Sequence, residues 1–200
     1  MSANYNFIEL FEREKECVMI PCVYDCGSAL AAELSGAKAT LLSGGELGES
    51  LLGKMEPLLT TDEVVHAVER ICEFSPLPMI VDVGAGFDVP LNAYRTAKRM
   101  VKAGAKALLL GNEHGGQPWE EYEALLKATL KACEGSDCIV IARNNDRFSD
   151  IEGLKECANF LNKALAVGAK ATMACGLCRT PKAKEFAKIL GEMVPGWKIY

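Results

Sequence analysis

A four-residue segment, Gly-Ala-Lys-Ala, occurs three times in this chain of 200 residues, at 36–39, 104–107 and 168–171. The first residues of successive copies are 104 − 36 = 68 and 168 − 104 = 64 positions apart. Each copy ends a helical pattern and leads into a short apolar run, so each interval covers two strand–helix units. Glycine is favoured just after the last turn of a helix. Three copies of one helix-end signal therefore favour a regular (β/α) barrel over an irregular doubly wound sheet.

The rest of the chain also alternates between strand and helix patterns, which is typical of a parallel sheet covered by helices. Thr60 and Glu63 have the spacing of a capping box at the start of one helix. We predict strands at 18–23, 39–43, 79–83, 107–110, 138–142, 171–174 and 197–200, and helices at 5–15, 28–34, 60–74, 92–103, 118–133, 151–167 and 180–193.

Seven predicted strands are one fewer than a closed (β/α)₈ barrel needs. We therefore expect an α/β chain with one incomplete TIM-type barrel domain over residues 1–200, in which residues 1–16 form a helical lead-in. Either the chain is a fragment or another element completes the wall of the barrel. We favour the fragment, because the last predicted strand stops almost as soon as it starts.

Composition limits the class of partner. The net charge is −5 and there is no basic stripe, so we expect no nucleic-acid partner. The apolar runs are shorter than a membrane span, and the N-terminal residues show no signal-peptide pattern. Nine cysteines without a secretion signal indicate a reducing compartment. We therefore expect a cytoplasmic protein that has no membrane partner.

The segment 79–88 is the first candidate for a functional site. A short apolar run, Met79 to Val83, predicts a buried strand, and Asp82 interrupts it. A carboxylate at the end of an apolar strand is unfavourable unless something pairs with it. Gly84 and Gly86 follow directly and would let backbone or ligand approach closely. The alternative is that Asp82 only caps the next loop.

Other polar residues follow the remaining predicted strands, where a parallel barrel carries its site. Ser43-Gly44-Gly45 offers a hydroxyl and backbone N–H groups to an anionic oxygen. Arg143 is suited to a bidentate contact with a carboxylate, and Asp82 to Mg²⁺. The set predicts a site for a small, oxygen-rich carboxylic acid, with an ordinary turn or a salt bridge as the alternative for each member. The strand-end residues are Tyr24-Asp25, Ser43-Gly44-Gly45, Asp82, Asn112-Glu113-His114, Arg143-Asn144-Asn145-Asp146 and Cys175.

In this order the residues resemble the isocitrate lyase/phosphoenolpyruvate mutase superfamily, from about Pro21 to the C-terminus. The segments that carry the resemblance are Val23-Tyr24-Asp25 with Ser28-Ala29, Leu42-Ser43-Gly44-Gly45, Leu52-Gly53 with Glu56, Leu77-Pro78 through Val81-Asp82 with Gly86-Phe87, and Ile141-Ala142-Arg143. The resemblance implies a (β/α)₈ barrel, Mg²⁺ (or Mn²⁺) and cleavage or formation of C–C or C–P bonds in small 2-oxo or 2-hydroxy acids through an enolate-type intermediate. It also implies a homo-oligomer, typically a tetramer that exchanges a C-terminal helix, which would lie beyond Tyr200.

The resemblance also implies roles for individual residues. Substrate binding falls to Tyr24, Ser43, Gly44, Gly45 and Arg143, and metal binding to Asp82 and Glu56. Glu113, one position after the place of a missing acidic pair, is added as a metal-binding candidate. Arg143 and His114 are the candidate catalytic residues, with His114 as a general acid or base because it follows a strand and precedes two glycines.

Three departures from the family pattern bear on activity. Gly84 stands where the family's metal strand has a second acid, and Gly111-Asn112 stands where it has a Glu-Asp pair. The Lys-Lys-Cys-Gly-His loop of the lyases is missing, and only residues 114–117 span that gap. Asp88, Glu113 and Asp146 are candidate replacements for the missing acids.

Two alternatives to a Mg²⁺-dependent carbon–carbon lyase or phosphomutase-like enzyme stay open. The first is a barrel without catalysis that binds a small carboxylate as a sensor or subunit, which the lost acids favour. The second is a cysteine-based metal or redox protein. Cys175 and Cys178 have C-x-x-C spacing, and Cys17, Cys22 and Cys26 surround the first predicted strand. Buried or incidental thiols are the simpler interpretation of these cysteines.

Overall fold

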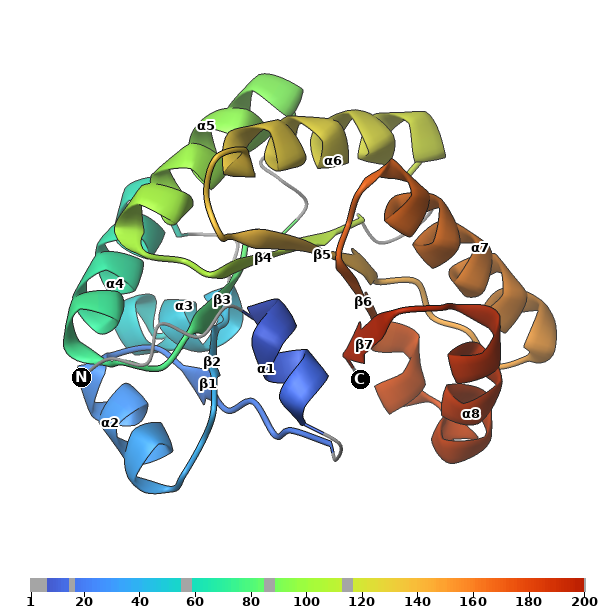
Figure 1. Ribbon diagram of the computed structural model, residues 1–200, viewed down its shortest axis with the longest axis horizontal. Coiled ribbons are helices and arrows are strands. Elements are labelled where there is room, and N and C mark those ends of the chain that lie inside the picture. Colours follow the sequence, from blue (N-terminus) through green and yellow to red (C-terminus); the bar gives the residue numbers. More distant parts are fainter. Residues whose placement is uncertain (1–6, 15–16, 55–58, 85–88, 113–116, 200) are drawn as a thin grey trace. The chain divides into compact units, whose positions relative to one another are not determined.

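A computed structural model describes residues 7–14, 17–54, 59–84, 89–112 and 117–199, and its helices and strands alternate along the chain (Figure 1). The strands are β1 (Cys22–Val23), β2 (Thr40–Leu42), β3 (Met79–Asp82), β4 (Ala107–Gly111), β5 (Ile139–Asn144), β6 (Ala171–Ala174) and β7 (Trp197–Ile199). The helices are α1 (Phe7–Arg13), α2 (Cys26–Leu34), α3 (Gly44–Leu52), α4 (Thr61–Phe74), α5 (Pro90–Ala103), α6 (Trp119–Cys133), α7 (Ile151–Val167) and α8 (Ala183–Met193), with a 3₁₀-helix η1 (Cys175–Arg179).

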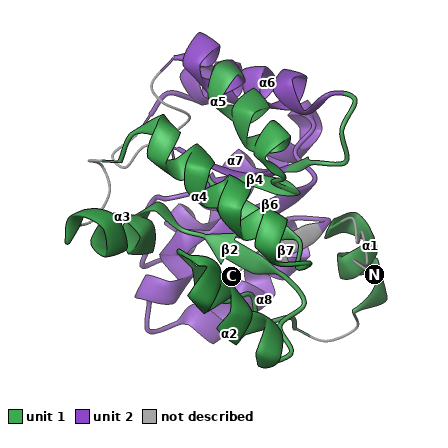
Figure 2. Ribbon diagram, turned by 90° about the vertical axis from the view of Figure 1, so that its left-hand side faces the viewer, with its two compact units in different colours: residues 1–83, 95–108, 135–139 green, residues 84–94, 109–134, 140–200 purple. Residues whose placement is uncertain are grey.

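The chain divides into two compact units, coloured separately in Figure 2. The first unit comprises residues 1–83, 95–108 and 135–139, and the second comprises 84–94, 109–134 and 140–200. Each unit is described by itself below.

In the first unit, β1, β2 and β3 pair in parallel. Cys22 lies opposite Leu41, and Thr40 lies opposite Met79. The strand residues Val23, Leu42 and Val81 are fully buried. Helix α4 buries Val64, Val65, Val68 and Ile71, whose spacing places them on one face of the helix. Each such side chain contributes roughly 1.5–3 kcal/mol by leaving water, so this strand–helix layer is the core of the unit.

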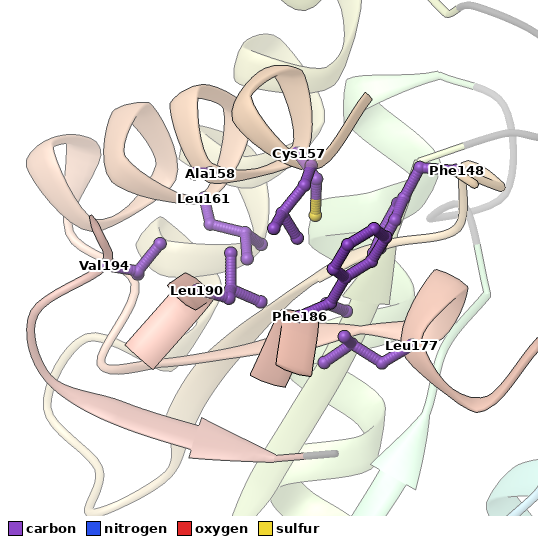
Figure 3. Close-up of a cluster of buried hydrophobic side chains, with 10 residues drawn as sticks. Phe148, Cys157, Ala158, Leu161, Leu177, Phe186, Leu190 and Val194 are labelled. Atoms are coloured by element: carbon purple, nitrogen blue, oxygen red, sulfur yellow. The ribbon is translucent and has the colours of Figure 1, made fainter. Parts of the chain in front are cut away.

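In the second unit, β5, β6 and β7 pair in parallel, with Ile141 opposite Ala171 and Ala171 opposite Trp197. Helices α7 and α8 pack on one another, and their buried side chains point toward one another in Figure 3. The cluster consists of Phe148, Leu154, Cys157, Ala158, Leu161, Ala174, Leu177, Phe186, Leu190 and Val194.

The strand order is β1-β2-β3-β4-β5-β6-β7, the same as the order along the chain. The predicted α/β class and the seven parallel-sheet strands of an incomplete barrel are therefore confirmed. Helix α7 and strand β6 have the predicted bounds. The single-domain organisation with a lead-in at 1–16 stays a prediction. Among the described residues, no helix combines the length and apolar character that crossing a bilayer requires.

Several elements differ from the sequence-based prediction, and three of the differences bear on the candidate site. Strand β1 keeps only two of the six predicted residues, and β5 extends to Asn144, so Arg143 lies within the strand instead of after it. Helix α3 was not predicted, because Gly44 and Gly45 at its start lower helix propensity. Its buried residues Leu47 and Gly48 show that packing outweighs that preference.

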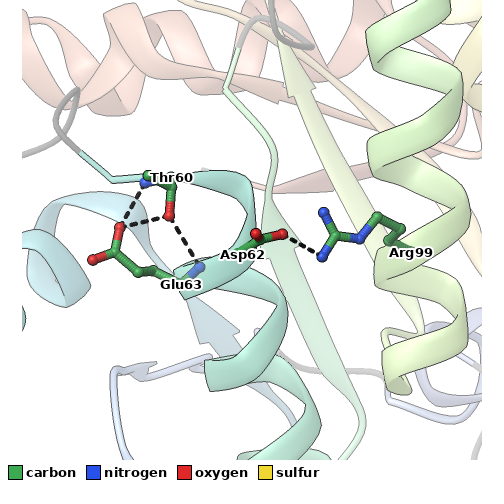
Figure 4. A network of polar contacts seen from close by, with 4 residues as sticks. All are labelled: Thr60, Asp62, Glu63 and Arg99. Carbon is green, nitrogen blue, oxygen red and sulfur yellow. Dashed lines mark hydrogen bonds and ion pairs between the residues drawn. The ribbon is translucent and has the colours of Figure 1, made fainter.

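The predicted capping box at the start of α4 is confirmed. Glu63 N donates to Thr60 Oγ1 over 3.3 Å, and Thr60 N donates to Glu63 Oε2 over 2.7 Å. Arg99 Nη2 of α5 lies 2.5 Å from Asp62 Oδ1 and ties α5 to the first turn of α4 (Figure 4). The Thr60 cap contributes about 1 kcal/mol to the stability of the helix.

The three Gly-Ala-Lys-Ala segments form the same helix end. Gly36, Gly104 and Gly168 all have positive φ, at 80°, 111° and 136°. After each, the alanine N–H reaches back to a carbonyl of the last helical turn: Ala37 to Ala32, Ala105 to Met100 and Ala169 to Ala164, each over 3.1 Å. This is the pattern of a Schellman motif. It turns the chain sharply from helix into strand, as the repeat predicted.

These glycines differ in their surroundings. Alanine substitutions can therefore distinguish the cost of backbone strain from the cost of crowding. A Cβ on Gly36 would meet nothing within 4 Å, whereas a Cβ on Gly104 would lie 2.8 Å from Cys72 Cβ. We expect Gly36→Ala to lower the free energy of unfolding by about 1–2 kcal/mol from backbone strain alone. Gly104→Ala should cost a further ~1–3 kcal/mol from overpacking. Urea unfolding of the two variants tests this, and equal losses would contradict the crowding at Cys72.

Candidate functional site

The candidate residues fall into two groups, one in each unit. The first group lies at the ends of β1, β2 and β3 and contains Tyr24, Asp25, Ser43, Glu46 and Asp82. The second lies at the ends of β4 and β5 and contains Asn112, Arg143, Asn144, Asn145 and Asp146. Glu56, Asp88, Glu113 and His114, which the sequence also nominates, lie outside the described residues.

The end of β1 is shaped by a helix cap. Asp25 precedes α2, and its Oδ1 accepts from Ser28 N over 2.7 Å. Ser28 Oγ in turn accepts from the backbone N–H groups of Tyr24 and Asp25, each over 3.1 Å. These hydrogen bonds hold the pKa of Asp25 below its usual value. The Tyr-Asp-x-x-Ser pattern is thus explained by local structure.

Tyr24 itself contacts solvent: its side chain is 39% exposed. It lines an open cavity of about 750 Å³ formed by residues 17–22 and α2. Its contact with a substrate stays a prediction.

Ser43, Gly44 and Gly45 lie at the N-terminus of α3, where Ser43 is the N-cap residue. The N–H groups of the first turn of a helix have no partner within the helix, and the helix dipole adds partial positive charge there. Gly44 is buried and Gly45 is half-buried. Because both are glycines, no side chain covers the backbone at this turn. This arrangement suits an anionic oxygen, and the binding of such a ligand stays a prediction.

Glu46 belongs to the same turn, and the sequence analysis missed it. The Ser43 hydroxyl donates a hydrogen bond to the Glu46 carboxylate instead of capping α3. The signal was present, because Ser43 and Glu46 have the same S-x-x-E spacing as a capping box. A hydroxyl has one proton, so Ser43 Oγ is left with acceptor capacity toward anything else that approaches it.

Asp82 ends β3 and is half-buried. The charge of Asp82 affects the thiol of Cys22 in β1. Desolvation raises the pKa of that thiol most, and the carboxylates of Glu46 and Asp82 raise it further. Two carboxylates therefore act on one thiol in this unit. Mg²⁺ is commonly held by one or two carboxylates together with water and substrate oxygens. Asp82 and Glu46 are ligands of the type that Mg²⁺ takes, although within the described part of the chain no three acidic, His or Cys side chains are grouped as metal ligands.

The second group is a network of amides around one carboxylate. Asp146 Oδ2 accepts from Asn112 Nδ2 over 3.0 Å and from Asn144 Nδ2 over 2.9 Å. Asn112 Oδ1 accepts from Asn145 N over 2.6 Å, and Asn112 O accepts from Asn145 Nδ2. Asn112, Asn144 and Asn145 are buried. These asparagines, which were not assigned a role from sequence, hold the ends of β4 and β5 together.

Arg143 packs against Gly111. A Cβ on Gly111 would lie 2.6 Å from Asn145 Nδ2, 2.9 Å from Arg143 Nε and 3.0 Å from Arg143 Nη2. The guanidinium also stands near Tyr122, whose hydroxyl donates to Leu110 O over 3.1 Å. Burial raises the pKa of Tyr122, and the charge of Arg143 opposes that shift. Arg143 and Asn145 thus fill the space that a side chain at 111 would need.

The cysteines are all free thiols. Cys175 and Cys178 lie in η1, where Cys178 Sγ is 3.0 Å from Cys175 O. Burial raises the pKa of Cys72 to about 11 and that of Cys157 to about 12, so these thiols are protonated at neutral pH. These two thiols are not among the cysteines on which the cysteine-based metal or redox alternative depends, and that alternative stays a prediction.

Comparison with known proteins places the chain among mutases and lyases. A family profile described as phosphoenolpyruvate phosphomutase matches residues 7–195. The chloroplastic carboxyvinyl-carboxyphosphonate phosphorylmutase of Arabidopsis thaliana is 30% identical over 200 residues, which cover 93% of this chain and 58% of that protein. A 2-methylisocitrate lyase of Aeropyrum pernix is 28% identical over 189 residues, covering 90% and 60%. The chain thus spans about 60% of the length of these two relatives.

A solved structure gives the same result for the fold. The crystal structure of 2,3-dimethylmalate lyase superposes with a TM-score of 0.81 at 25% identity, covering 93% of this chain and 66% of that one.

The packing at Gly111 predicts the effect of adding one methyl group. Gly111→Ala should displace Asn145 and Arg143 and lower the free energy of unfolding by about 1–3 kcal/mol. The control is Gly27→Ala in the first turn of α2, where the new Cβ would make only ordinary contacts with the side chain of Asp25, the closest at 3.5 Å. Denaturant unfolding of both variants tests this, and a Gly111→Ala protein as stable as the control would contradict the packing.

The low pKa of Asp25 predicts a pH dependence. Because the folded state lowers this pKa, the cap stabilises the protein above the unfolded pKa of about 3.9 and is lost as pH falls through the folded value. Asp25→Ala should therefore lower Tm by about 2–4 °C near pH 7, from the ~1 kcal/mol of a lost cap, and by less near pH 3. Thermal unfolding followed by circular dichroism measures both, and a Tm difference that does not depend on pH would refute this.

Proposed function

The chain belongs to the phosphoenolpyruvate phosphomutase family, in the isocitrate lyase/phosphoenolpyruvate mutase superfamily, and on that premise we propose that it is a Mg²⁺-dependent lyase or phosphomutase-like enzyme. Its substrate is a small 2-oxo or 2-hydroxy carboxylic acid, in which it acts on a C–C or C–P bond. The observation that carries the proposal is the start of α3 at Gly44, directly after Ser43. A glycine turn with outward N–H groups is suited to a carboxylate or phosphonate oxygen.

Within this proposal the first group binds and orients an acidic head group. The N–H groups of Gly44 and Gly45 donate to the head group. Because the Ser43 hydroxyl donates its hydrogen bond to Glu46, Ser43 Oγ accepts from a hydroxyl or water. Mg²⁺ would be held by Asp82 with Glu46, by Glu56 as the resemblance implies, and by Glu113 as the replacement for a missing family acid. When bound, it would supply positive charge beside the substrate oxygen on which negative charge develops.

Within the same proposal, Arg143 binds a carboxylate of the substrate. A guanidinium offers a planar pair of N–H donors that matches a carboxylate, and its charge is retained at any physiological pH. Its packing against Gly111 and Asn145 fixes it in place before a ligand arrives, which lowers the entropy lost on binding. His114 is proposed as the general acid or base.

A second candidate function is carboxylate binding without turnover, as a sensor or subunit. It is favoured by Gly111, where the family's acid is replaced and where the space is filled by Arg143 and Asn145. Gly84 removes a second acid near Asp82. We retain the enzyme as the first proposal because Ser43, Asp82 and Arg143 are all present. A cytoplasmic location and a homo-oligomer, tetrameric as the resemblance implies, complete the proposal.

Ligand binding is tested with oxalate, separately from turnover. We expect Mg²⁺ with oxalate to raise Tm, since a ligand that binds only the folded state stabilises it. Arg143→Lys should weaken oxalate binding at least tenfold, or about 1.4 kcal/mol, because a point charge replaces the bidentate fork. Arg179→Lys, at an exposed arginine in η1, should leave it unchanged.

A screen of 2-oxo and 2-hydroxy acids, followed by detection of the products, decides between the two candidates. Turnover supports the enzyme, and oxalate binding without turnover of any acid supports the sensor or subunit. Equal oxalate affinity in the two arginine variants would remove Arg143 from the site.

A further inference from the structure

The second unit contains a cavity that the proposed function does not use. Its volume is about 360 Å³, which is within the range of small-molecule sites. It is open to solvent on one side and is lined by the start of α6, residues 153–163 of α7 and the segment after β5. Trp119 and Phe160 form part of its wall, and its polar lining consists of Asn144, Asp146, Arg147, Glu156, Asn159 and Lys163.

The aromatic wall has a fixed geometry. The rings of Trp119 and Phe160 meet edge to face, with centroids 5.5 Å apart and an interplanar angle of 87°. The fully buried Tyr122 packs on Phe160, with 4.6 Å between the two ring centroids. Lys163 Nζ lies 5.3 Å from the centroid of the Trp119 ring. Such a wall is preformed for a flat apolar group.

The lining also carries the carboxylate of Asp146. Asp146 is half-buried, and its Oδ2 accepts from the amides of Asn112 and Asn144. Both amide N–H groups are thereby directed at the carboxylate, which leaves Asn144 with its acceptor oxygen. Asn144 Oδ1 is buried and has no donor among the residues that the structure describes. Asp146 and Asn144 therefore offer acceptor oxygens to the cavity, which Arg147 and Lys163 also line.

The side-chain partners of Asp146 in the described part of the chain are neutral amides. No lysine or arginine in the described ranges forms an ion pair with it, although Arg147 and Lys163 line the same cavity. Its field reaches Cys157 in the cavity wall, where it adds to the effect of burial on the thiol pKa. A half-buried carboxylate without a cation favours a positively charged ligand.

We propose that this cavity binds a small primary amine with an aromatic or other flat apolar body. The ammonium group lies against the Asp146 carboxylate and donates to it, with Asn144 Oδ1 as a second acceptor, and the body packs on Trp119 and Phe160. A carboxylate ligand is disfavoured at this end because it would face another carboxylate. The proposal does not depend on the reaction proposed above.

Three probes that share one ring test the charge requirement: 2-phenylethylamine, 2-phenylethanol and phenylacetate. Calorimetric titration of the unmodified chain should show the amine binding at least tenfold more tightly than the alcohol, and phenylacetate more weakly still. In a Trp197→Phe protein, Trp119 is the remaining tryptophan, and its fluorescence should change on adding the amine. Equal affinity for the three probes, or tighter binding of phenylacetate through Arg147 and Lys163, would overturn the proposal.

Variants locate the site. Asp146→Asn should reduce amine affinity at least tenfold and remove the preference over the alcohol. Glu192→Gln, at an exposed acid of α8, should change neither. Because Asp146 also holds Asn112 and Asn144, the Tm of each free variant is measured first. If Asp146→Asn does not fold, Trp119→Leu replaces it and should weaken the amine and the alcohol alike. Amine binding that survives Trp119→Leu unchanged would place the site elsewhere.

Discussion

The structure depends on a helix end that turns the chain back into a parallel strand. Each turn needs one residue with positive φ, and glycine takes that conformation without a clash between Cβ and the backbone. Gly36, Gly104 and Gly168 meet this need, and the alanine after each satisfies a carbonyl of the last helical turn. The strand ladder begins soon after each turn: Lys106 N donates to Met79 O, Lys170 N to Val140 O and, in the first copy, Thr40 N to Pro78 O. One local device thereby sets where three strands begin.

Local signals of this kind explain what could be predicted. The glycine ends, the Thr60–Glu63 box and the apolar periodicity of α7 depend on neighbours in sequence, and the structure has them as expected. Helix α3 and the extension of β5 to Asn144 depend on packing between distant segments, which one sequence does not reveal. The role of Glu46 was within reach, because its spacing from Ser43 matches a box recognised elsewhere in the chain.

For the candidate site, sequence predicted the residue types better than their bonding. Ser43, Gly44 and Gly45 do begin a helix, and Asp82 does end a buried strand. The partners of these groups could not be read from sequence. Asp25 is committed to Ser28 in a cap, and Asp146 accepts two amide hydrogen bonds. The asparagine network depends on β4 and β5 ending side by side, so its members, 112 and 144–146, are more than thirty positions apart.

The filled space at Gly111 has a consequence for how substitutions combine. Any side chain at position 111 would have to displace the amide of Asn145 and the guanidinium of Arg143. A smaller residue at 145 would have to come earlier to make room. The order in which positions 111 and 145 change therefore governs whether a larger residue at 111 is tolerated.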